Sequence, residues 1–158
     1  MNEQTPSRDR IMEILSSRPL APASEMLGFR IIDLDPEKGT ARVGYQAKPE
    51  FCNPLGVIQG GFLTAMVDEA MAVACVAMAN FSIFIPTLEL KVSFLRAGYP
   101  GPMEATGQVV RMGKSVAFLE GSLFDGDGNL LIRASATGKV TRREKIDAAK
   151  KARADGGA

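Results

Sequence analysis

The chain contains no histidine and no tryptophan, and only two of its 158 residues are cysteine. Without histidine, a Ser–His–Asp or Cys–His catalytic arrangement is excluded, as is any histidine proton shuttle, and the commonest zinc ligand is missing. Cys52 and Cys75 are too few for a structural zinc site, and both lie beside apolar residues. We therefore expect no metal site, and buried reduced thiols in preference to a disulfide.

The chain also lacks an excess of charge of either sign, since 19 Lys and Arg face 18 Asp and Glu for a net charge of +1. The chain therefore lacks the excess of positive charge that is typical of nucleic-acid binding. The N-terminus has no apolar signal core. The longest apolar run, residues 62–78, carries Asp68 and Glu69 at its centre, where a membrane span would make them costly. We expect a cytoplasmic protein that binds neither nucleic acid nor membranes.

The spacing of apolar residues divides the chain into two helices and several strands. Residues 6–17 are expected to form a helix with Ile11, Ile14 and Leu15 on one face, after which Pro19 and Pro22 are expected to keep the chain irregular. The run over residues 62–78 is apolar nearly all round, which is typical of a buried helix. Alternating apolar and polar residues predict strands over residues 29–34, 40–48, 82–96, 103–112, 116–124 and 130–140.

This order of elements predicts an α+β domain. Strands joined by hairpins and polar on one face form an antiparallel sheet, and only the long helix can cover the apolar face of that sheet. A curved antiparallel sheet wrapped around one long central helix is the hot-dog fold. A single copy leaves sheet edges and part of the helix exposed, so we expect a dimer. The domain is assigned to residues 26–141, preceded by a helix and loop over residues 1–25. Residues 142–158 form a charged tail that we expect to be a solvated helical extension or disordered.

The segment that leads into the long helix has the composition of a functional loop. Asn53-Pro54 favours a turn, and the glycines Gly60 and Gly61 let another group approach the backbone closely. The first turn of a helix leaves N–H groups unpaired at a partly positive end, which suits an anion or a polarised carbonyl. Asp68 lies in the middle of the same apolar helix, where an ionised carboxylate is costly unless it has a partner or a function.

These residues resemble the signature of the hot-dog thioesterases of the phenylacetate-degradation (PaaI-like) group, relatives of the 4-hydroxybenzoyl-CoA thioesterases. That family pattern is Asn, five residues, His-Gly-Gly, and an Asp or Glu on the helix seven residues further on. The matching stretches here are Asn53-Pro-Leu-Gly56, Gln59-Gly60-Gly61, Asp68-Glu-Ala70, Pro86-Thr-Leu-Glu-Leu90 and the segment 111–118. The similarity covers about residues 26–140 and leaves out the N-terminal helix and the tail.

The resemblance implies hydrolysis of an acyl-CoA thioester to a free acid and CoA. Asp68 would attack the thioester or activate water, and the Gly60 N–H would polarise the carbonyl. Asn53 would help to hold the water or the carboxylate, Thr87 would orient the nucleophile, and Gln59 takes the place of the family's histidine. The groove for coenzyme A, which is part of the substrate and not a cofactor, would be lined by Arg111, Met112, Gly113, Lys114, Ser115 and Val116.

The spacing of two of these residues favours a site shared between subunits. Gly60 and Asp68 are eight residues apart, roughly 12 Å along a helix. A catalytic carboxylate and a carbonyl-polarising N–H must converge within about 3–4 Å of one carbon. One helix cannot do this, but two antiparallel helices across a dimer axis can. We expect a homodimer that forms a dimer of dimers and takes acyl-CoA as its substrate.

Structural alternatives remain open for most of these assignments. Asp68 and Glu69 also fit a buried structural pair across a dimer, Asn53 fits a cap of its own loop, and Thr87 fits an ordinary sheet residue. Gln59 donates hydrogen bonds but carries no proton, so the chain fits either a thioesterase or a non-catalytic acyl-CoA binding module of the same fold. A dehydratase or hydratase of this fold normally moves protons with histidine, and the chain has none.

Overall fold

The computed structural model describes residues 8–144 and residue 148. Its main sheet has six strands in the order β1-β2-β5-β6-β7-β4, and every neighbouring pair is antiparallel. Two short strands, β3 and β8, form a separate ribbon. In chain order the elements are α1 (Arg8–Ser17), α2 (Pro22–Leu27), β1 (Arg30–Asp35), β2 (Thr40–Ala47), a 3₁₀ turn (Pro49–Phe51), α3 (Gly60–Met78), β3 (Ile83–Phe84), β4 (Thr87–Phe94), β5 (Gly101–Met112), β6 (Val116–Asp125), β7 (Leu130–Lys139) and β8 (Thr141–Arg142).

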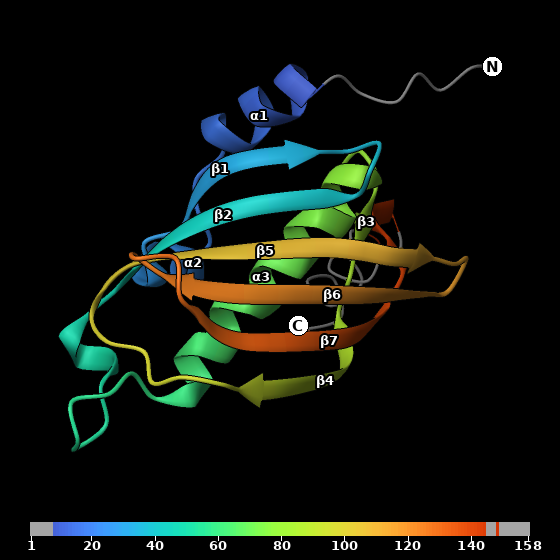
Figure 1. The fold of residues 1–158 in the computed structure, drawn as a ribbon. Coiled ribbons are helices and arrows are strands. Elements are labelled where there is room, and N and C mark those ends of the chain that lie inside the picture. Colours follow the sequence, from blue (N-terminus) through green and yellow to red (C-terminus); the bar gives the residue numbers. More distant parts are fainter. Residues whose placement is uncertain (1–7, 145–147, 149–158) are drawn as a thin grey trace, which may run out of the picture.

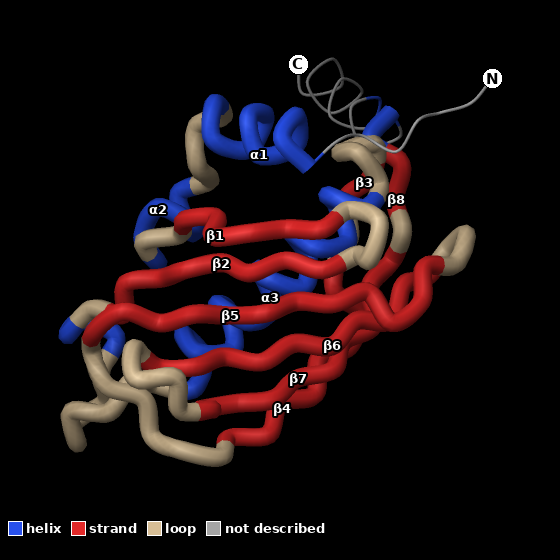
Figure 2. Tube along the Cα trace, turned by 45° about the horizontal axis from the view of Figure 1, so that its top comes forward, coloured by secondary structure: helices blue, strands red, loops and turns tan. Residues whose placement is uncertain are grey.

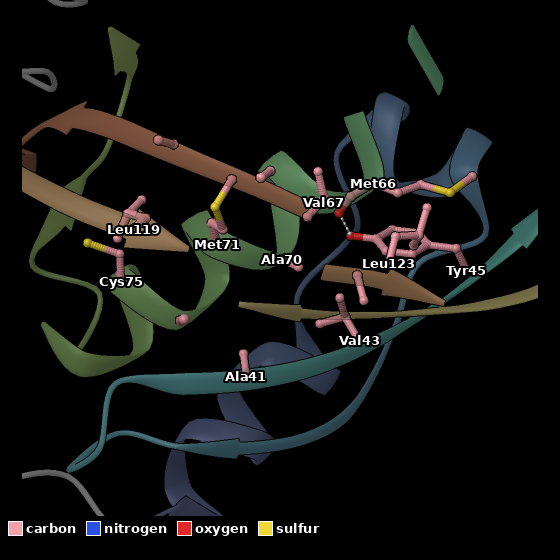
Figure 3. Packing of buried hydrophobic residues seen from close by; sticks show 14 of the residues in the cluster. Ala41, Val43, Tyr45, Met66, Val67, Ala70, Met71, Cys75, Leu119 and Leu123 are labelled. Atoms are coloured by element: carbon pink, nitrogen blue, oxygen red, sulfur yellow. Dashed lines mark hydrogen bonds between the residues drawn. The ribbon is translucent and has the colours of Figure 1, made fainter. Parts of the chain in front are cut away.

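The long helix α3 crosses one face of this sheet, and the hydrophobic core lies between the two (Figure 1). Fully buried side chains of α3, including Met66 and Met71, pack against those of the strands (Figure 3). The Tyr45 hydroxyl of β2 donates a hydrogen bond of 2.8 Å to the Met66 carbonyl. The predicted α+β class and hot-dog architecture are confirmed.

Two glycines let α3 approach the sheet closely. Gly107 of β5 and Gly121 of β6 are direct partners across the sheet. A Cβ atom on Gly107 would lie 2.2 Å from the Ala70 carbonyl oxygen, and one on Gly121 would lie 2.7 Å from a Val67 methyl. Real Cβ atoms essentially never come this close to another atom. The middle of α3 therefore packs directly against the backbone of the sheet at these two glycines.

The structure differs from the sequence-based expectation in the segment after α1. Residues after Pro22 were expected to be irregular, but they form the helix α2. Proline at the first helical position is favourable because its missing N–H would be unpaired there anyway. Gly28 ends the helix at φ 69°, and its N–H and that of Phe29 donate to the carbonyls of Glu25 and Ser24.

The predicted strand over residues 82–96 is also divided in two. Pro86 has no N–H to give to a ladder, and the chain changes partners there. β3 pairs with β8, whereas β4 pairs with β7. Cys52 and Cys75 are both free; Cys75 is buried as expected, whereas Cys52 is only half-buried. The expectation for the tail falls almost entirely outside the described residues.

The two edges of the sheet have different surroundings. Helix α1 lies along β1 (Figure 2), and Arg8 Nη2 of α1 reaches Asp33 Oδ1 of β1 at 2.7 Å. The other edge strand, β4, has no neighbour on its outer side among the described residues. Leu88 and Phe94 of β4 expose 60% and 55% of their surface.

Helix α3 meets the length and composition of a membrane span, but so do the core helices of soluble proteins.

Candidate active site

The structure brings Asp68 and Thr87 together at the open edge of the sheet. Asp68 is half-buried on α3, and Thr87 is the first residue of β4. The Thr87 hydroxyl donates a hydrogen bond of 2.9 Å to Asp68 Oδ1. This bond fixes the orientation of the carboxylate and leaves its Oδ2 atom without a hydrogen bond among the described residues. The carboxylate is therefore held by one oxygen and available through the other.

Gly60 starts α3, with Gln59 as its N-cap residue. The Gln59 side chain is exposed and makes no capping hydrogen bond. Within the described part of the chain, the Gly60 N–H has no backbone acceptor. An unpaired donor at the positive end of a helix of 19 residues is suited to a carbonyl oxygen that gains negative charge.

Asn53 stabilises its own loop. Its Oδ1 atom accepts hydrogen bonds from the N–H groups of Leu55 and Val57, at 2.9 and 3.3 Å. Its backbone N–H donates to the Val57 carbonyl at 2.8 Å. The structure therefore places Asn53 as a cap of the turn that precedes α3, and within one chain it makes no hydrogen bond with Asp68.

Glu69 faces a different direction from Asp68. The Ser24 hydroxyl of α2 donates a short hydrogen bond to Glu69 Oε1, while the buried Oε2 atom has no partner among the described residues. The neighbouring Tyr45 hydroxyl has its pKa raised, first by burial and then by the Glu69 and Asp68 carboxylates. The two adjacent acids thus accept hydrogen bonds from different side chains, Thr87 and Ser24. A structural pair across a dimer concerns contacts between two copies and stays an open alternative.

The segment predicted to line a CoA groove forms the hairpin between β5 and β6. Arg111 and Lys114 are exposed, and the Gly113 N–H closes the turn by donating to the Val116 carbonyl at 2.8 Å. The Ser115 carbonyl accepts from Val140, next to Lys139, whose N–H donates to the Pro86 carbonyl. The hairpin therefore lies at the same end of the sheet as Thr87, with β7 between them, and away from Gly60.

A hollow of about 460 Å³ lies at the start of α3, at the opposite end of β4. Its lining includes Gly60 and the apolar residues Val57, Ile58, Leu63, Phe94 and Leu95. The Phe94 ring covers Gly60, because a Cβ atom on Gly60 would lie 2.9 Å from two ring carbons. Neither Phe94 nor the Ser24–Glu69 bond was singled out in the sequence, since each depends on contacts between distant segments.

Comparison with known proteins identifies the family of this chain. The thioesterase superfamily profile matches residues 55–132. A provisionally named thioesterase, a phenylacetic acid degradation-related protein from Ralstonia eutropha JMP134, has a crystal structure that superposes with a TM-score of 0.75. It is 34% identical, and the match covers 82% of this chain and 98% of that one.

Two relatives of known sequence extend the comparison. A provisionally named esterase of Saccharolobus solfataricus is 33% identical over 118 residues, which are 75% of this chain and 82% of the relative. The 1,4-dihydroxy-2-naphthoyl-CoA hydrolase of Listeria monocytogenes is 24% identical over 121 residues, which are 77% of this chain and 97% of the relative. The fold, the open carboxylate beside Thr87 and these similarities agree: the chain belongs to the thioesterase superfamily and has the hot-dog fold of its phenylacetate-degradation-related members.

Proposed function

We propose that this thioesterase-superfamily protein hydrolyses acyl-CoA thioesters to a free acid and CoA. The Asp68 carboxylate either takes a proton from a water that attacks the carbonyl carbon, or attacks that carbon itself. In the second case the acyl–Asp68 anhydride that remains after CoA leaves is hydrolysed by water, which releases the acid and restores the carboxylate. The Gly60 N–H stabilises the negative charge that forms on the carbonyl oxygen. The carbon–sulfur bond then breaks and CoA leaves as a thiolate, which needs little help from an acid. No metal or cofactor takes part, and the exposed Lys114 and Arg111 are available for the CoA phosphates.

The hydrogen bond between Thr87 and Asp68 is the main support for this assignment. A half-buried carboxylate on an apolar helix is costly, and Thr87 offsets only part of that cost because it binds one oxygen. The second oxygen has no hydrogen-bond partner among the described residues, and Thr87 lies on the edge strand β4. A CoA thioester hydrolase among the relatives of this chain agrees with the proposed substrate class.

The contacts of β4 support a site built from two copies of the chain. Thr87 at the start of β4 contacts Asp68, whereas Phe94 at its end contacts Gly60. These residues are seven apart, about 23 Å along a strand. If two β4 edges pair antiparallel about a two-fold axis at their centres, the Thr87 end of one meets the Phe94 end of the other. Asp68 then approaches the partner's Gly60, and each dimer has two sites.

A subunit-mixing experiment tests this arrangement directly. Asp68→Asn removes the carboxylate and Gly60→Pro removes the N–H, while proline remains acceptable at a first helical position. Gly60→Ala is the control, because it also places a Cβ atom against the Phe94 ring but keeps the N–H. Gln59 already has φ −61° and ψ 135°, a conformation compatible with a following proline. Asp68→Asn and Gly60→Pro should each release little CoA alone. Mixed, unfolded and refolded together in equal amounts, they should regain about a quarter of the wild-type sites, because half of the dimers are mixed and each has one intact site.

Two results would contradict the proposal. Activity that stays absent in the mixture, with mixed dimers shown by native mass spectrometry, would show that Asp68 of one subunit does not act together with Gly60 of the other. Tight binding of acyl-CoA without release of thiol from any aryl or fatty acyl ester would instead identify a binding module. Gln59 in place of the family's histidine is the feature that makes this second outcome worth measuring.

A further inference from the structure

The hollow at the start of α3 has a lining suited to the acyl part of a thioester. Its side chains are nearly all apolar, and Arg96 is the one ionisable residue among those that line it. Its volume of about 460 Å³ lies within the usual range for small-ligand sites. Gly60, whose N–H is assigned to the substrate carbonyl in the proposed function, is itself part of this lining.

Phe94 forms the wall of the hollow nearest to Gly60. The edge of its ring contacts the Gly60 backbone so closely that a Cβ atom would lie 2.9 Å from Cε1 and Cζ. Phe94 ends β4, where the backbone continues through Leu95, whose N–H donates to the Leu131 carbonyl at 2.8 Å. The ring is therefore attached to a strand end that is itself bound to the sheet, and it narrows the space beside the reacting carbonyl.

We propose that Phe94 determines the acyl specificity, and that the protein selects apolar acyl groups that are unbranched or flat next to the thioester carbonyl. A straight chain or an arylacetyl group passes the ring edge, whereas a methyl branch on the carbon next to the carbonyl collides with it. This inference rests on the proposed function where it concerns rates of hydrolysis. The shape of the hollow also governs the binding of compounds that cannot be hydrolysed.

The test compares pairs of CoA esters of nearly equal size. Butanoyl-CoA is paired with 2-methylpropanoyl-CoA, and phenylacetyl-CoA with 2-phenylpropanoyl-CoA. Wild-type protein should prefer the unbranched member by about tenfold or more in kcat/KM, which is the lower end of the discrimination that one methylene gives in a hydrophobic pocket. Phe94→Ala should reduce this preference to less than about threefold, and Phe94→Trp should increase it.

Two further measurements make the result specific to this ring. Phe118→Ala is the matched control, because Phe118 lies on the opposite face of the sheet and exposes 49% of its surface, close to the 55% of Phe94. It should leave the preference unchanged. Phe94→Leu keeps an apolar side chain at the edge strand, so it separates loss of the ring from loss of folding. Thermal unfolding of each variant accompanies the kinetics.

Binding distinguishes failure of this inference from failure of the proposed hydrolysis. The probes are S-(2-oxopentyl)-CoA and S-(3-methyl-2-oxobutyl)-CoA, ketones that keep the carbonyl but cannot be cleaved at sulfur. If wild-type protein hydrolyses esters but Phe94→Ala keeps the wild-type preference, the specificity role is wrong and the hydrolysis stands. If no ester is cleaved but Phe94→Ala abolishes the preference for the straight ketone, the specificity role stands alone. Wild-type protein that binds neither ketone and cleaves no ester would overturn both.

Discussion

The Ser24 hydroxyl donates a hydrogen bond to Glu69 Oε1, and this bond ties the short helix α2 to the middle of α3. The two residues are 45 positions apart in the chain. The other carboxylate oxygen is buried without a partner among the described residues. Glu69 is therefore a half-satisfied acid at a helix–helix contact, and Ser24 donates the hydrogen bond that its Oε1 atom accepts.

Removing the Ser24 hydroxyl should destabilise the fold. In Ser24→Ala, Glu69 keeps its burial but loses its donor, which typically costs about 1–3 kcal/mol of unfolding free energy. Urea unfolding should show a lower midpoint and an unchanged slope. Ser17→Ala is the control, because the exposed Ser17 hydroxyl donates only to the Ile14 carbonyl at 3.2 Å. Its removal should change the stability by less than about 0.5 kcal/mol.

The complementary variant is Glu69→Gln. A glutamine still accepts the Ser24 hydrogen bond and removes the possibility of a buried charge. It should therefore be at least as stable as the wild type, and Ser24→Ala should cost less in its background. Equal losses from Ser24→Ala in both backgrounds would show that the Ser24–Glu69 bond is not the source of the effect.

The next prediction concerns the Thr87 hydroxyl. Thr87→Val keeps the branched shape in the strand but removes the donor to Asp68 Oδ1. A hydrogen bond to a charged group is typically worth about 1.5–3 kcal/mol, so kcat should fall by about 10- to 100-fold. Thr87→Ser should retain most of the rate. The assay follows release of free thiol, and Thr137→Val on β7 serves as a control for the same exchange elsewhere in the sheet. Equal rates for Thr87→Val and wild type would make Thr87 an ordinary sheet residue.

Much of the fold could be predicted from local patterns. The apolar run of α3 and the alternation in β2, β5, β6 and β7 are signals carried by neighbouring residues, and the structure has these elements within a few residues of the expected bounds. Helix α2 was missed because Pro22 was interpreted only as a helix breaker, whereas proline also starts helices. Gly28 after Leu27 was a usable signal for the end of α2.

Sequence patterns alone predicted less of the candidate site than of the fold. Asp68 was conspicuous as an acid in an apolar helix, but its pairing with Thr87 was implied only by the family resemblance. Asn53 had two open interpretations, and its bonds to Leu55 and Val57 favour the cap of its own loop. The contacts of Phe94 with Gly60 join an edge strand to a helix start, and no local spacing reports such a contact.

The next prediction compares two glycine substitutions, one where the sheet contacts α3 and one in the first turn of α3. Gly107→Ala would place a methyl group 2.2 Å from the Ala70 carbonyl, so α3 or the sheet has to move, at a cost of about 1–3 kcal/mol or more. Gly61→Ala meets nothing within 4 Å and lies in the first turn of α3, where alanine is the better helix former. Thermal unfolding should therefore show a loss for Gly107→Ala and no loss for Gly61→Ala. The reverse order would mean that α3 does not rest on β5 at this point.

The last prediction concerns stability at alkaline pH. Burial raises the pKa of the Cys75 thiol from 9.0 to about 11. Between these values the unfolded chain loses the thiol proton while the folded chain keeps it, so the stabilisation is complete below pH 9 and is lost as the pH rises to about 11. The loss should amount to about 2–3 kcal/mol. Tyr45 adds a further fall above about pH 10, because burial and the nearby Glu69 carboxylate raise its pKa as well.

Cys75→Ala tests the sign and the pH range of this effect. The variant should begin less stable at pH 7, because Cys75 is fully buried, but lose less stability than the wild type between pH 9 and 11. Cys52→Ala is the control, since Cys52 is only half-buried. Urea unfolding at closely spaced pH values gives, for each protein, the slope of the unfolding free energy against pH. Parallel curves for Cys75→Ala and wild type would show that the Cys75 thiol does not titrate differently in the folded and unfolded chains, and the alkaline loss would then belong to Tyr45.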